Sequence, residues 1–155
     1  MVSRPKDIGT AGESAVVRYL RSNGMAGAER RALAGANDLG DITGTPGLCW
    51  EVKSGKAAQN AGAAQTKLID DWLGQTLTET QNADADFGVL VCKRAGVGAA
   101  NAGLWWAYLR CDDFLALHGH PGPRAGVDVI RVTLAEAVAL LRHAGYGDEL
   151  PAVSA

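Results

Sequence analysis

Three residues have types and a spacing that could do chemistry together: Asp41 and, one short turn later, Glu51 and Lys53. In a β-strand the side chains at i and i+2 share a face, so Glu51 and Lys53 point the same way. Thr45-Pro46-Gly47 is typical of a β-turn, with Pro at its second position and Gly at its third. A hairpin about that turn places Asp41 roughly opposite Glu51. Two carboxylates beside an ammonium could hold a hard cation next to a phosphate.

The Glu-x-Lys pair also has a plainer interpretation. Glu51 and Lys53 could form a solvated salt bridge on an amphipathic strand, since such pairs are common. On the other face of that strand, Leu48, Trp50 and Val52 form an apolar row that we expect to face the core. The alternation therefore predicts a strand with one buried face and one polar face.

A third acid, Glu13, lies in residues 10–22, which we expect to be helical. Val16 and Leu20 belong to an apolar stripe at helical spacing, and Glu13 falls on the same stripe. A buried carboxylate without a partner is costly, so this acid needs one. It could reach over the sheet towards the other acids, or it could complete a capping box with Thr10 at the helix start.

The residues around Asp41 offer further candidates. Arg30 and Arg31 could grip phosphates, although a solvated edge strand is the usual place for such a pair. Asp38 is either an auxiliary ligand or a turn-forming residue. Gln65, one turn into the following helix, suits contact with a phosphate or a water, and a solvated helix face is its default interpretation.

Composition indicates one acidic domain without a membrane segment. The chain has 155 residues, 47% of them hydrophobic, and a net charge of −2, which argues against indiscriminate coating of nucleic acid. No apolar run approaches the ~20 residues that span a bilayer, and no export segment opens the chain. Cys49, Cys92 and Cys111 read as reduced, so we expect a cytoplasmic protein. Residues 1–8 read as a basic arm and residues 148–155 as a loose tail.

The remaining sequence alternates helical and strand patterns, which predicts an α/β fold with a mixed central sheet flanked by helices. The run at 87–92 is almost entirely apolar, as in a strand that is covered on both faces. Thr133 and Glu136 form a capping-box pattern at the start of the last helix. We expect a mobile loop at 55–62, helices at 63–80, 112–118 and 133–144, and strands at 87–92, 104–110 and 127–132.

The order and spacing of these motifs resemble the PD-(D/E)XK nuclease superfamily and, more narrowly, the Holliday junction resolvases of actinobacterial phages; archaeal resolvases share the core. The likeness covers roughly residues 9–119. Gly40 stands where the family often has Pro before the motif aspartate. The residues that carry the resemblance are Gly12-Glu13, Glu29-Arg30-Arg31, Gly35, Asp38-x-Gly40-Asp41-Ile42, Glu51-Val52-Lys53 and Lys93-Arg94.

The resemblance implies a single-domain, restriction-endonuclease-like core with metal-dependent DNA endonuclease activity. Asp41, Glu51 and the carbonyl of Val52 would hold Mg²⁺, or Mn²⁺ in its place, with Glu13 binding directly or through water. Lys53 would be the catalytic lysine beside these acids. Hydrolysis would leave a 5′-phosphate and a 3′-hydroxyl.

The expected substrate is branched or double-stranded DNA. Five basic residues should line the face of the acid cluster and bind it: Arg30, Arg31, Lys56, Lys93 and Arg94. Resolving a four-way junction takes two symmetric nicks, so we expect a homodimer with at least one of Trp72, Trp105 and Trp106 buried between subunits. The alternatives are a restriction or repair endonuclease of the same core, or an inactive DNA-binding module. A phage-encoded protein would act in the host cytoplasm.

Overall fold

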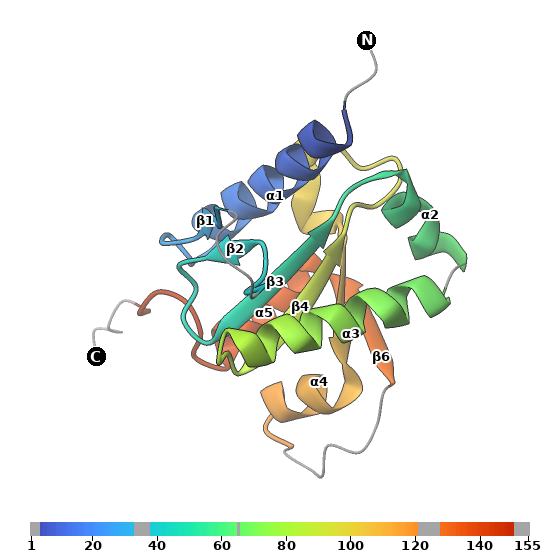
Figure 1. The fold of residues 1–155 in the computed structure, drawn as a ribbon. Coiled ribbons are helices and arrows are strands. Elements are labelled where there is room, and N and C mark those ends of the chain that lie inside the picture. The colour runs from blue at the N-terminus through green and yellow to red at the C-terminus, as the bar shows by residue number, and fades with distance from the viewer. Residues whose placement is uncertain (1–3, 33–37, 65, 121–127, 151–155) are drawn as a thin grey trace.

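A mixed four-stranded sheet forms the centre of the molecule in the computed structural model, which describes residues 4–32, 38–64, 66–120 and 128–150 (Figure 1). The strands lie in the order β3-β4-β5-β6, with β3 parallel to β4 and the other neighbours antiparallel. The predicted α/β class with a mixed sheet is confirmed. The strands are β3 (Leu48–Lys53), β4 (Phe87–Cys92), β5 (Trp106–Arg110) and β6 (Val129–Thr133).

Different helices cover the two faces of this sheet. One face packs against α1 (Pro5–Ser22), α5 (Leu134–His143) and the 3₁₀-helix η1 (Ala99–Leu104). The other face packs against α2 (Lys56–Ala64) and α3 (Thr66–Asn82). In Figure 1, α3 lies in front of the sheet and α5 behind it.

Three short elements complete the fold. Two strands, β1 (Glu29–Arg30) and β2 (Ile42–Thr43), form a separate antiparallel sheet beside α1. A short helix, α4 (Cys111–Leu117), follows β5. Within the described residues, no helix is both long and apolar enough to cross a membrane.

The alternation along β3 separates two hydrophobic cores. Trp50 is fully buried and, with Val52, packs in the core that contains Val16 and Leu20 of α1. The opposite face of the sheet contributes Leu90 of β4 to the smaller core beneath α2 and α3. Every residue of β4 is buried, as its apolar run predicts. The predicted inward face of β3 is confirmed.

The first helix begins earlier than its apolar stripe suggests. It starts at Pro5, because a proline at the first helical position has its φ already set and lacks an N–H that would need a partner. Thr10 consequently lies inside α1, so the predicted capping box with Glu13 is wrong. Residues 5–8 of the predicted basic arm belong to α1.

The capping box at Thr133 and Glu136 is confirmed. The Thr133 side chain accepts a hydrogen bond from the Glu136 backbone at 3.1 Å, and the Glu136 side chain accepts one from the Thr133 backbone. These bonds satisfy backbone donors that the first turn of a helix leaves free. Helix α5 begins directly after Thr133.

One segment predicted to be loose is largely helical, and the first residue of another makes a tertiary hydrogen bond. Of residues 55–62, predicted to be a mobile loop, all but Gly55 belong to α2, since alanine favours helix and Ala58 and Ala61 are buried against the sheet. At the other end of the chain, Asp148 accepts a hydrogen bond from the Ala26 backbone at 2.9 Å. The predicted loose tail is therefore wrong at its first residue. The cysteines are free, as predicted.

Candidate functional site

Asp41 is joined to β3 by hydrogen bonds from both its backbone and its side chain. Its N–H donates to the Trp50 carbonyl at 2.8 Å, and its Oδ2 accepts from the Val52 N–H at 2.7 Å. The strand that follows, β2, pairs with β1, so the predicted regular hairpin between β2 and β3 is wrong. Asp41 nevertheless lies beside Glu51, within one residue of the expected register.

Two glycines shape the chain around Asp41. Gly47 has φ +83° in the turn that the Leu48 N–H closes on the Thr45 carbonyl, as the turn pattern predicts. Gly40 has φ +92°, and a Cβ there would come within 2.9 Å of the Trp50 carbonyl oxygen. Proline fixes φ near −65°, so it could not adopt this conformation. This explains why a glycine precedes the aspartate here.

Glu51 and Lys53 form an ion pair in which the acid is buried and the lysine side chain is 28% exposed. Lys53 Nζ lies 2.9 Å from Glu51 Oε1, and the Glu51 side chain is only 9% exposed. The pair differs from a fully solvated salt bridge because α3 packs against β3 and Glu51 is buried, while Lys53 keeps partial access to solvent. Lys53 Nζ also lies 5.7 Å from the centroid of the Trp72 ring.

The ion pair sets the charge state of Lys53. Burial alone would lower the pKa of Lys53, because it disfavours the charged ammonium. The hydrogen bond with Glu51 and the negative charges of Glu51 and Asp41 outweigh burial, so the pKa lies above its usual value. Lys53 is consequently a fixed positive charge at neutral pH.

A further acid, Glu79 of α3, joins the cluster, and the sequence analysis missed it. Glu79 is 6% exposed, and among the described residues its Oε2 has no hydrogen-bond partner. Burial, the hydrogen bond with Glu51 and the charges of neighbouring acids raise its pKa to about 9. A signal existed: Glu79 follows Trp72 by two helical turns, which puts both on one side of the predicted helix.

Asp41 shares the electrostatic environment of this cluster. Burial and the charge of Glu51 raise the pKa of Asp41 to about 7, with a smaller contribution from Glu13. The hydrogen bond from Val52 opposes the shift, because it stabilises the ionised carboxylate. The acids therefore repel one another, and Lys53 is the cation that contacts Glu51.

Glu13 lies at the side of this cluster with a partner of its own. Arg30 Nε lies 3.0 Å from Glu13 Oε2, and Arg30 Nη2 is 3.4 Å from Thr10 Oγ1. The pairing provides the compensation that the position of Glu13 on the apolar stripe demands. The role of Glu13 as a metal-binding acid stays a prediction, as does DNA binding by Arg30.

The loop before Asp41 is held by several short contacts. Asp38 Oδ1 accepts a hydrogen bond from the Gly40 N–H at 3.0 Å, which supports its turn-forming interpretation. Asn82, at the end of α3, donates to the Asp38 carbonyl at 3.1 Å. Arg31 donates its backbone N–H to the Asp41 carbonyl. Gly35 and Gln65 lie outside the described residues.

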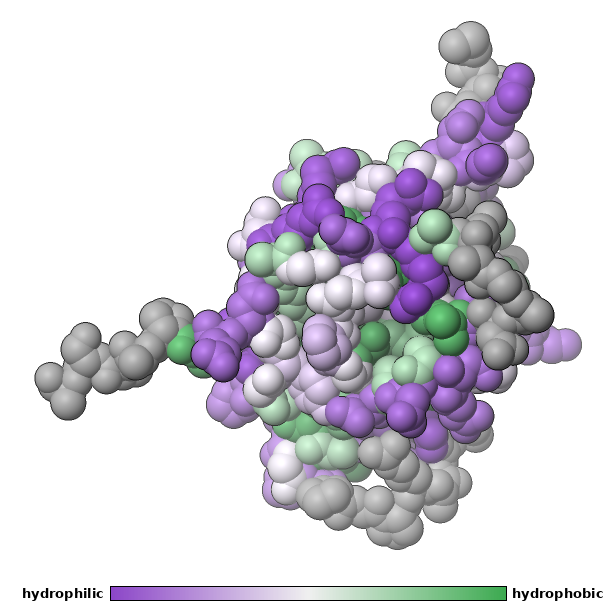
Figure 2. All heavy atoms as spheres, turned by 60° about the vertical axis from the view of Figure 1, so that its left-hand side comes forward, coloured by the Kyte–Doolittle hydropathy of each residue, from purple (hydrophilic) through white to green (hydrophobic). Residues whose placement is uncertain are grey.

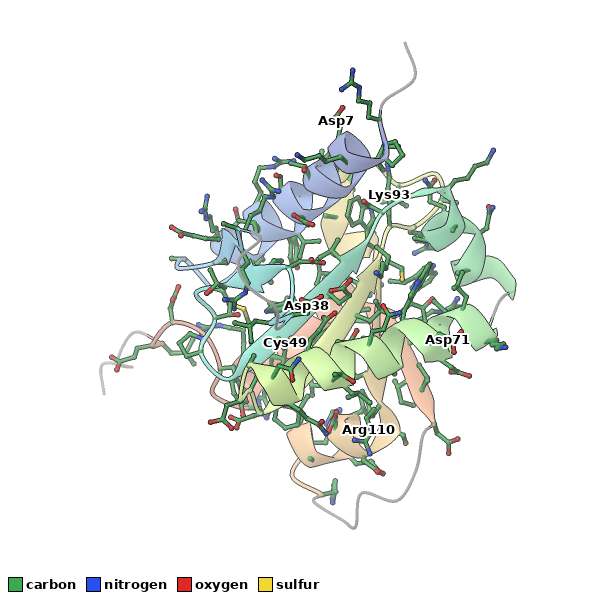
Figure 3. The ribbon with its side chains drawn as sticks, viewed as in Figure 1. Asp7, Asp38, Cys49, Asp71, Lys93 and Arg110 are labelled. Carbon is green, nitrogen blue, oxygen red and sulfur yellow. The ribbon has the colours of Figure 1, made fainter. Side chains whose placement is uncertain are left out.

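The other predicted DNA-binding residues lie at the ends of β3 and β4. The Lys93 N–H donates to the Lys53 carbonyl at 2.8 Å, and Lys93, which Figure 3 labels, directly follows β4, with Arg94 next in the chain. Lys56 is exposed at the start of α2. The Lys93 side chain lies over Trp105, whose ring belongs to the core beneath α1, so Lys93 does not share the sheet face of Lys53. Arg30 and Arg31 lie on the β1 side.

The donor set near Asp41 suits Mg²⁺. In the described ranges, no three His, Cys, Asp or Glu side chains are already arranged to hold a metal ion. Mg²⁺ commonly uses one or two carboxylates, with waters and substrate phosphates completing its shell. Strand alternation places the Val52 carbonyl on the Asp41 side, since the Trp50 carbonyl accepts the Asp41 N–H and the Lys53 carbonyl bonds across to β4. Asp41, Glu51 and this carbonyl fit that mode.

Comparison with known proteins finds no relative of this chain. No protein-family model, no curated protein and no solved structure matches the chain. The site is therefore defined by its own geometry, in which Asp41, Glu51 and Lys53 lie together, α3 adds Glu79, and Glu13 pairs outside them.

The raised carboxylate pKa values predict a stability that falls as pH rises. Asp41 and Glu79 keep protons up to about 7 and about 9 in the folded protein, whereas their ordinary values are 3.8 and 4.5. Between these limits the unfolded chain binds fewer protons than the folded one, so alkali favours unfolding. In metal-free buffer, the midpoint of thermal unfolding of the wild type should fall progressively from about pH 4 to pH 9.

The Glu79→Gln variant should weaken this dependence, because the amide resembles the protonated acid and cannot ionise. Asp71→Asn is the matched control, since Asp71 is an exposed acid on the same helix. Calorimetry or circular dichroism over the pH series measures both. Equal slopes in wild type and Glu79→Gln would contradict the assigned environment of Glu79.

Proposed function

We propose that this chain is a metal-dependent DNA endonuclease with a restriction-endonuclease-like core, acting as a Holliday junction resolvase. The observation that carries the proposal is the arrangement on β3. The Val52 N–H holds Asp41 Oδ2 at 2.7 Å, and Glu51 and Lys53 pair at 2.9 Å on the adjacent positions. Two carboxylates and a fixed ammonium then lie where one phosphodiester could meet all of them.

Each residue has a defined task in hydrolysis. Asp41, Glu51 and the Val52 carbonyl would hold Mg²⁺, which when bound polarises the phosphate and acidifies a water. Lys53, kept charged by Glu51, would orient the attacking water and offset the negative charge that develops on the phosphoryl oxygens. Water adds to phosphorus as the bond to the 3′-oxygen breaks, leaving a 5′-phosphate and a 3′-hydroxyl, as the resemblance implies.

A catalytic lysine could deprotonate the attacking water or could act as a fixed cation, and the charge of Lys53 distinguishes these two roles. A general base must be unprotonated near the working pH, and a raised pKa keeps Lys53 in the ammonium form. Electrostatic stabilisation needs that same ammonium form. We therefore assign Lys53 the role of a positioned cation rather than that of a base.

The junction substrate requires two sites in one assembly. Two symmetric nicks need a pair of active sites related by a twofold axis. Tryptophan burial gives this dimer little support, because Trp105 is only 1% exposed within its own chain, and Trp72 and Trp106 carry cations over their rings. The dimer follows from the proposed reaction.

Replacing either metal-binding acid should abolish DNA cleavage without weakening DNA binding. Asp41→Asn and Glu51→Gln each delete a metal ligand and a negative charge near the DNA phosphate. We expect loss of cleavage by at least about 10²-fold with DNA affinity unchanged or tighter. A gel assay of four-way junctions and plain duplex, with Mg²⁺ and with EDTA, measures cleavage, and a shift assay in EDTA measures binding.

Asp71→Asn again serves as the control and should cleave like wild type. Cleavage by Asp41→Asn or Glu51→Gln near the wild-type rate would refute the assigned roles. Equal cleavage of duplex and junction would leave the endonuclease standing and favour a restriction or repair enzyme over a resolvase.

Cation binding can be measured without DNA. A ligand that binds only the folded state raises the unfolding midpoint, and Mg²⁺ should do so here by relieving repulsion between Asp41, Glu51 and Glu79. The increase should be reversed by EDTA and should be lost in Asp41→Asn. If neither Mg²⁺ nor Mn²⁺ changes the unfolding midpoint of the wild type, the metal site is contradicted.

The oligomeric state gives a separate test of the substrate. We expect a dimer in sedimentation at micromolar concentration, or formation of one on junction DNA. A monomer under both conditions would contradict junction resolution, while leaving single-site DNA cleavage intact.

A further inference from the structure

Trp106 carries two guanidinium groups over its ring. Arg94 Cζ and Arg131 Cζ each lie 4.1 Å from the ring centroid. Arg94 follows β4 and Arg131 belongs to β6, so segments distant in the sequence supply the two cations. Trp106 is itself partly exposed, which leaves this cluster accessible at the surface.

Strand register places this cluster on the same face of the sheet as Lys53. Lys53 pairs with Cys92, and Cys92 pairs with Trp106, so the three side chains form a row across β3, β4 and β5. Arg131 pairs with Tyr108, whose side chain also lies in the core on that face. Neighbouring strands are about 4.8 Å apart, so the backbones at Lys53 and Trp106 are separated by about 10 Å.

The guanidinium groups are held in place but keep unused donors. Arg131 Nη1 donates to the Gly62 carbonyl at 2.7 Å, and Arg94 Nη1 lies 3.4 Å from the Leu104 carbonyl. A guanidinium has five N–H donors, so most remain for a ligand. Gly62 allows the close approach of α2, since a Cβ there would come within 3.0 Å of the Trp106 ring.

Neither of these two arginines has an acidic partner among the described residues. The ion pairs found in the described part of the chain are Arg30–Glu13, Lys53–Glu51 and Arg110–Asp112. Arg94 and Arg131 therefore present uncompensated positive charge on a protein whose net charge is −2. Such a local concentration attracts a polyanion that the molecule as a whole would not.

We propose that Arg94, Trp106 and Arg131 form a phosphate-binding surface that holds the DNA backbone beyond the cleavage site. This inference rests on the proposed nuclease function and adds Trp106 and Arg131 to the residues expected to bind DNA. Planar guanidiniums bind phosphate oxygens through two parallel hydrogen bonds. The ring orients both guanidiniums beforehand, which lowers the entropy lost on binding.

The test measures DNA affinity across a salt titration by fluorescence anisotropy, in EDTA, with labelled duplex and four-way junctions. Arg131→Gln should weaken binding to both by about tenfold and flatten the salt dependence by about one unit. Arg131→Lys keeps the charge but loses the planar fork, so it should retain the slope with reduced affinity. Trp106→Leu should also weaken binding although both arginines remain.

Arg18→Gln is the matched control, because Arg18 is an exposed arginine on α1, which covers the opposite face of the sheet. Thermal unfolding checks that each variant is folded, and Arg94→Gln replaces Arg131→Gln if loss of the contact with Gly62 prevents folding. A loss in Arg18→Gln equal to that in Arg131→Gln would show a general charge effect and overturn the surface.

The outcomes also distinguish a failure of this phosphate-binding surface from a failure of the proposed nuclease function. Variants of Arg94, Trp106 and Arg131 that bind as wild type would overturn the surface, while metal-dependent cleavage by the wild type would still support the nuclease. A wild-type protein that binds no DNA even at low salt would refute both the surface and the proposed function.

Discussion

The hydrogen bond from the Val52 amide to the Asp41 carboxylate is the interaction on which the candidate site depends. Strand β3 lies at one edge of the central sheet, and edge strands leave backbone donors without a ladder partner. Asp41 meets that need with both its backbone and its side chain. The contact depends on Gly40 for two reasons. Its positive φ is one that other residues rarely adopt, and a Cβ at this position would collide with β3. The hydrogen bonds that join Asp41 to the edge strand therefore also place its carboxylate beside Glu51.

Helix α3 changes the chemistry of the acids that this contact brings together. By covering the face that carries Glu51, it shields this acid from water and adds Glu79. Buried carboxylates destabilise a fold unless cations compensate them. The raised pKa values of Asp41 and Glu79 express that cost, which is typical of sites arranged for function rather than for stability.

Aromatic rings contact several of the cations on both faces of the sheet. Trp72 lies beneath Lys53, Trp105 is 6.0 Å from Lys93 Nζ, and Trp106 carries Arg94 and Arg131. Lys53 is also paired with Glu51, whereas Arg94 and Arg131 have no acidic partner among the described residues, so their charges stay available to a phosphate. Hydrophilic side chains also dominate the upper part of the surface in Figure 2, where α1 lies.

Sequence alone determined the features that depend on neighbouring residues: the two faces of β3, the buried run of β4, the turn at Gly47 and the capping box at Thr133. These follow from side-chain periodicity and from backbone preferences, which act over a few residues. Tertiary structure alone decided that Glu79 meets Glu51, that Arg30 pairs with Glu13, and that Arg131 lies over Trp106. The partners in these contacts are distant in the sequence, so only the packing of helices and the order of strands could bring them together.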